Sequence, residues 1–144
     1  MVALLYIGSK FLAYSAWMFW GLRALRNEST PSPLGSLALG FLRLCLGLLF
    51  GVLIYLLSAT LLSHLGYGLA PNILTYLAVY VPVRWIEWSI MAVILLPGSF
   101  AQFFVGVRKP DRLWRLGGIV ISCLADIPLI IGLGGVIPTG RFLC

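Results

Sequence analysis

The chain contains four apolar stretches, each long enough to cross a lipid bilayer. They cover approximately residues 2–22, 37–62, 73–96 and 116–137. A helix rises about 1.5 Å per residue, so roughly 20 residues cross a hydrocarbon core of about 30 Å. We therefore expect an all-α, polytopic membrane protein. Residues 1–144 are predicted to form a single transmembrane domain, a bundle of four helices.

The composition supports lipid as the solvent of this chain. Hydrophobic residues make up 61% of the sequence and charged residues only 10%. A soluble domain of this length has too little interior to hide so much apolar surface. One histidine and three scattered cysteines predict no metal site, cofactor or disulfide framework. No nucleophile occurs together with a base, so we expect no catalytic residue and no enzyme.

Basic residues are distributed unevenly among the segments that connect the apolar stretches. They lie between the first and second stretches and between the third and fourth: Arg23, Arg26, Arg108, Lys109, Arg112 and Arg115. The positive-inside rule places both basic loops in the cytosol and both termini outside. The loops set orientation and could also contact anionic lipid. The second is too short for a nucleic-acid-binding domain.

Five charged residues interrupt the apolar stretches: Lys10, Arg43, Arg84, Glu87 and Asp126. Each costs about 2.5 to 3.5 kcal/mol to place in hydrocarbon. Counted from the outer face, the first group (Lys10, Arg84 and Asp126) lies about 12 to 16 Å deep. Arg43 and Glu87 lie about 21 Å deep. Depth therefore predicts two layers of charge, each with an acid and a base.

Helical phase predicts the partners within this set of charges. Arg84 and Glu87 are three residues apart and share one helix face with Tyr80 and Met91. We expect Glu87 to lie between Arg43 and Arg84, and Asp126 to pair with Lys10 or Arg84. The near balance of three bases and two acids favours structural ion pairs. The alternatives are contact with a partner's membrane segment, or a proton or ion path through Glu87 and Asp126.

Small residues predict where the helices approach one another. Gly47 and Gly51 have the spacing of four that permits close packing, and Gly118 and Ser122 lead to Asp126 at the same spacing. The first expectation is that the second helix packs on the fourth within one chain. The alternative is a homodimer formed through the same faces.

The segment Val81-Pro82-Val83-Arg84-Trp85-Ile86-Glu87-Trp88, in a compact four-helix chain, resembles small inner-membrane proteins of Gram-negative bacteria. In kind it is similar to immunity proteins against pore-forming Rhs-type effectors of type VI secretion. The resemblance implies an inner-membrane protein that binds and neutralises a membrane-inserting toxin. Arg84 and Glu87, or the small-residue seams, would be the contacts. The alternative function is a small proton or ion channel, or a transporter subunit.

Overall fold

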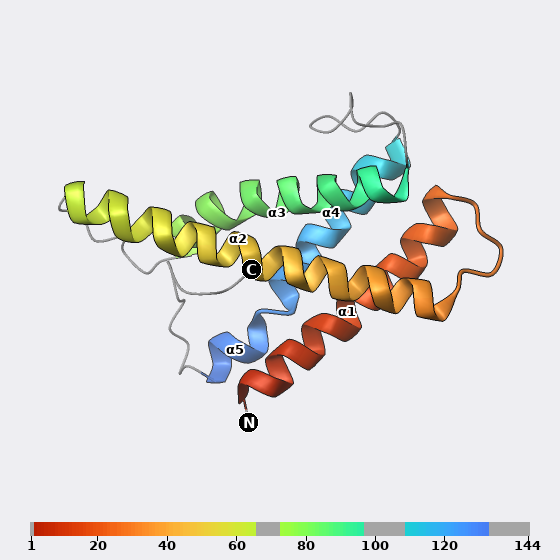
Figure 1. The fold of residues 1–144 in the computed structure, drawn as a ribbon, viewed down its shortest axis with the longest axis horizontal. Coiled ribbons are helices and arrows are strands. Elements are labelled where there is room, and N and C mark those ends of the chain that lie inside the picture. Colours follow the sequence, from red (N-terminus) through yellow and green to blue (C-terminus); the bar gives the residue numbers. More distant parts are fainter. Residues whose placement is uncertain (1, 66–72, 97–108, 133–144) are drawn as a thin grey trace.

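The computed structural model describes residues 2–65, 73–96 and 109–132, with side chains over 4–56, 80–96 and 110–132. Its helices are α1 (Val2–Leu25), α2 (Pro33–Leu65), α3 (Ile73–Leu95), α4 (Lys109–Leu124) and α5 (Ile127–Gly132). No strand occurs in these ranges, so the all-α prediction is confirmed (Figure 1). Figure 1 shows α2 and α3 along the long axis, with α1 and α4 oblique to them.

The fourth apolar stretch differs most from its prediction. The helix begins at Lys109, seven residues before the expected start at residue 116. A turn at Ala125 and Asp126 then divides it into α4 and α5. Pro128 follows this turn, and proline cannot donate the backbone hydrogen bond that a continuous helix needs. The predicted end at residue 137 lies outside the described residues.

Helix α2 begins at Pro33, four residues before the predicted start, because Ser32 and Pro33 favour the N-terminus of a helix there. Ser32 precedes it, and its Oγ accepts a hydrogen bond from the Gly35 amide at 3.3 Å. Serine is a preferred N-cap, and proline suits the first helical position because its missing N–H would be unpaired anyway. The end of α1 is marked by Asn27, whose φ of 53° is left-handed.

We expect Ser32→Ala to destabilise the protein by about 1 kcal/mol, because the first turn of α2 loses its side-chain cap. The free energy of unfolding in detergent micelles measures this effect. Ser29→Ala, in the same connecting segment, is the matched control and should change stability by less than about 0.5 kcal/mol. Equal losses in the two variants would contradict the capping role.

The predicted packing of the second helix on the fourth is wrong. α2 packs mainly on α1, whereas α4 lies against α3 and α1 and has at most a marginal contact with α2. The reason is visible at Gly40 of α2. A Cβ there would lie 2.8 Å from the backbone of Ser15 in α1, so the missing side chain permits the α1–α2 crossing.

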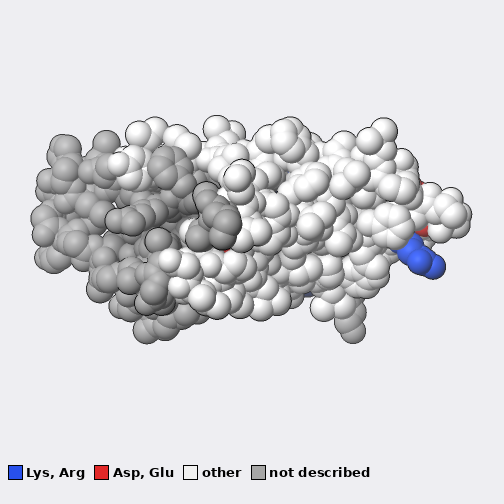
Figure 2. All heavy atoms as spheres, turned by 90° about the horizontal axis from the view of Figure 1, so that it is seen from below, with Lys and Arg blue, Asp and Glu red and all other residues white. Residues whose placement is uncertain are grey.

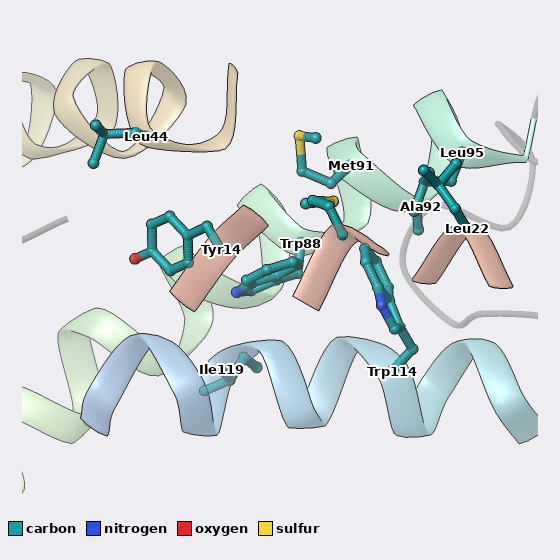
Figure 3. Packing of buried hydrophobic residues seen from close by; sticks show 10 residues of the cluster. Tyr14, Leu22, Leu44, Trp88, Met91, Ala92, Leu95, Trp114 and Ile119 are labelled. Atoms are coloured by element: carbon teal, nitrogen blue, oxygen red, sulfur yellow. The ribbon is translucent and has the colours of Figure 1, made fainter. Parts of the chain in front are cut away.

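The core is centred on Trp88 of α3 (Figure 3). Its ring meets Tyr14 of α1 edge to face at 5.8 Å and Trp114 of α4 at 5.2 Å. Such aromatic pairs contribute about 0.5 to 1.5 kcal/mol beyond their burial. One side chain therefore joins three helices, and Met18 of α1 and Met91 of α3 pack into the same cluster.

The outer surface is mostly apolar. Leu34 is 76% exposed and Ile131 is 70% exposed. On the face shown in Figure 2, charged atoms gather at the end where α1 turns into α2, and most of the described remainder is uncharged. Two helical stretches, Pro33–Leu56 and Pro110–Gly132, are long and apolar enough to cross a membrane.

Candidate functional site

The five charged residues predicted from the sequence all lie inside the bundle. Lys10 comes from α1, Arg43 from α2, Arg84 and Glu87 from α3, and Asp126 from the turn between α4 and α5. None of them is more than 1% exposed. Four chain segments thus turn their charges toward one another, while many of their leucines and isoleucines are exposed.

Asp126 is the centre of the first charge cluster, which we define as Tyr6, Lys10, Arg84 and Asp126. Lys10 Nζ lies 2.8 Å from Asp126 Oδ1, and the Tyr6 hydroxyl donates to the same oxygen at 3.0 Å. Arg84 Nη2 donates to Asp126 Oδ2. The ammonium group of Lys10 also lies over the Tyr6 ring at 4.6 Å, a favourable cation–π distance.

The break between α4 and α5 orients Asp126 toward this cluster. The Asp126 amide donates to the Cys123 carbonyl, one residue nearer than in a regular α-helix, at 3.1 Å. The Asp126 carbonyl then accepts from the amides of Leu129 and Ile130, so the residue also begins α5. Cys123 contributes its Sγ as an acceptor for Arg84 Nη1 at 2.8 Å.

Arg43 and Glu87 form the second charge cluster together with Tyr14 and Trp88. Arg43 Nη2 donates to Glu87 Oε2 at 2.5 Å. The guanidinium carbon lies 4.9 Å from the Tyr14 ring centre and 5.0 Å from that of Trp88. Glu87 Oε1, Arg43 Nε and Nη1 and the Tyr14 hydroxyl have no hydrogen-bond partner among the described residues. This cluster is therefore less fully hydrogen-bonded than the first.

The structure separates the charges into the two groups that depth predicts. Lys10, Arg84 and Asp126 lie together, and Arg43 pairs with Glu87 as expected. Asp126 binds both bases that the sequence left as alternatives. The expected ion pair between Arg84 and Glu87 is wrong, because the Arg84 guanidinium turns across the bundle to Asp126. Arg84 and Glu87 are 1% and 0% exposed, so both side chains are enclosed by the bundle in the isolated chain.

A fourth buried ion pair, Asp111 with Arg115, was not predicted from the sequence, because both residues were assigned to a cytosolic loop. Arg115 Nε and Nη2 bind the Asp111 carboxylate at 3.0 and 2.9 Å, and Nη1 donates to Ser89 of α3 at 2.8 Å. The sequence carries the signal for this arrangement. Pro110 suits a first helical turn, and Asp111 and Arg115 are four residues apart, as neighbours on one helix face are.

The small residues predicted as packing sites are all buried. Gly47 and Gly51 lie on the buried face of α2. A Cβ on Gly118 would clash with the Trp88 ring, so this glycine makes room for the indole. Trp88 Nε1 then donates to Ser122 Oγ at 3.1 Å. The small residues Gly118 and Ser122, which lead to Asp126 along the helix, therefore pack α4 against α3.

An open apolar groove of about 480 Å³ lies between α3 and α4. α3 contributes one wall and α4 the other, with Val81, Pro82, Trp85, Ile86, Leu116 and Ile119 as the lining residues. The α3 wall belongs to the segment 81–88. Trp85 is half-buried, and its ring lies 5.8 Å from the Arg115 guanidinium.

The arrangement can neutralise charge and hold helices together. The two charge clusters contain three bases and two carboxylates, all joined in ion pairs. Within the described ranges, no three His, Cys, Asp or Glu residues come together as a metal site would require.

Comparison with known proteins finds no matching family model, no matching curated protein and no matching solved structure.

Proposed function

We propose that the chain is a four-span protein of the bacterial inner membrane, with its basic segments in the cytosol and both termini outside. The supporting observation is the inverted distribution of side chains: the charges at Lys10, Arg43, Arg84, Glu87 and Asp126 are buried, whereas large apolar residues are exposed. Water would favour the opposite arrangement, and hydrocarbon favours this one.

A topology experiment tests this proposal. Alkaline phosphatase fused after residue 30 should be inactive, because the enzyme would remain in the cytosol. The same enzyme fused after residue 68 should be active, because two helices return the chain to the outer face. Green fluorescent protein at the two positions should show the reverse pattern. Activity at both positions, or at neither, would contradict the four-span arrangement.

We further propose that the protein is an immunity protein, which binds a membrane-inserting pore-forming toxin and blocks its assembly. The resemblance of segment 81–88 to small inner-membrane immunity proteins supports this function. The α3–α4 groove provides an apolar surface beside that segment. The alternative of an ion channel or transporter has less support, because Glu87 and Asp126 both form ion pairs within the bundle.

Bacterial cells that express a candidate Rhs-type pore-forming toxin provide the functional test. The wild-type chain should preserve their membrane potential. Ile86→Trp fills the groove and should weaken toxin binding by about tenfold or more, which corresponds to about 1.4 kcal/mol. Val120→Trp, on the exposed side of α4, is the matched control and should protect as wild type does. If the toxin still depolarises cells in which the wild-type chain is present in the membrane, that toxin is not the partner of this protein.

A further inference from the structure

The two buried carboxylates are unequally supplied with hydrogen-bond donors. Asp126 accepts from Tyr6 and from the two bases Lys10 and Arg84. Glu87 accepts from Arg43 at Oε2, while its Oε1 has no partner among the described residues. Three bases share two acids, so one acid carries two bases in any fully paired arrangement. In the structure that acid is Asp126.

Arg84 is the base that can reach either carboxylate. It lies three residues before Glu87 on α3, and residues at that spacing are neighbours on the helix surface. Moving its guanidinium from Asp126 to Glu87 keeps the number of ion pairs at three. Asp126 would keep Lys10 and Tyr6, and Glu87 Oε1 would gain a donor. Two packings that satisfy the same charges are the requirement for a bistable element.

We propose that Arg84 alternates between Asp126 and Glu87. When Arg84 pairs with Asp126, it connects the α4–α5 turn to α3, and when it pairs with Glu87, this connection is broken. In the structure as described, Arg84 joins α3 to this turn. In the exchanged state Arg84 pairs within α3, and the turn is held by Lys10 and Tyr6 of α1. α5, which already packs on α1, then moves with α1 relative to α3. This device goes beyond the immunity function and does not depend on it.

Distances between spin labels on α3 and α5 test the exchange in purified protein reconstituted in lipid. Ile94 and Ile131 are exposed on these helices and accept the labels as cysteines. The native cysteines are replaced by Cys45→Ala, Cys123→Ser and Cys144→Ser; serine at 123 keeps an acceptor for Arg84. Pulsed electron paramagnetic resonance then gives the distribution of distances.

The variant Arg43→Gln removes the present partner of Glu87, so it should draw Arg84 to Glu87 and enrich a second α3–α5 distance. The double variant Arg43→Gln with Glu87→Gln removes the alternative acceptor as well, and should leave a single peak at the α3–α5 distance of the state in which Arg84 pairs with Asp126. Both variants lack Arg43, and the double variant retains Asp126 with its two bases, Lys10 and Arg84. Identical distributions in the two variants would overturn the proposal. Loss of the second distance in the double variant would support it.

Discussion

Glu87→Gln should destabilise the bundle by about 3 to 5 kcal/mol, the cost of removing one partner from a buried ion pair. The substitution leaves Arg43 fully buried without its carboxylate. It also leaves three buried bases with one acid, Asp126. The free energy of unfolding in detergent micelles measures the loss, and a lower yield of folded protein in membranes should accompany it.

Three further variants separate the ion pair from general damage to α3. Adding Arg43→Gln to Glu87→Gln should recover most of the loss, because a neutral pair replaces the isolated charge. Arg43→Gln alone should cost less than Glu87→Gln, because it leaves two bases for two acids. Arg23→Gln, on the exposed end of α1, should change stability by less than about 0.5 kcal/mol. A double variant no more stable than Glu87→Gln would exclude the proposed energetic coupling.

The grouping of the buried charges could be predicted because depth along a helix follows directly from residue number. Lys10, Arg84 and Asp126 come from α1, α3 and the α4–α5 turn, yet counting from the ends of the apolar stretches places them at one level. The partner of Arg84 was harder to predict. Glu87 is its neighbour on the helix surface and Asp126 its neighbour across the bundle; both satisfy charge, but depth places only Asp126 in the layer of Arg84. The predicted Arg84–Glu87 pair coincides with the exchanged state proposed above.

Helix neighbours could not be predicted from the small residues. A glycine shows that something approaches closely, but it does not identify the approaching element. Gly40 admits the backbone of α1, and Gly118 admits the indole of Trp88 from α3. The buried pair Asp111–Arg115 was missed for a different reason. Its residues were assigned to a basic loop by charge, although their spacing of four and the preceding proline favour a helix.

Gly40→Ala should destabilise the protein by about 1 to 3 kcal/mol, the usual cost of forcing an extra methyl group into a packed interface. The added Cβ would clash with Ser15 Oγ and would lie 2.8 Å from the Ser15 backbone. The hydroxyl can rotate away from the new methyl group. The backbone can yield only if α1 and α2 separate, and their contact is the most extensive in the bundle.

Gly8→Ala is the matched control, because no atom lies within 4 Å of a Cβ at that position of α1. Alanine is a better helix former than glycine by about 0.8 to 1 kcal/mol, so this variant should be as stable as wild type or more stable. The two substitutions add the same atoms and differ in what those atoms meet. Opposite signs in the measured free energies of unfolding would therefore assign the α1–α2 crossing to the close approach at Gly40. Equal effects would mean that helix propensity, rather than the crossing, determines the stability change at both glycines.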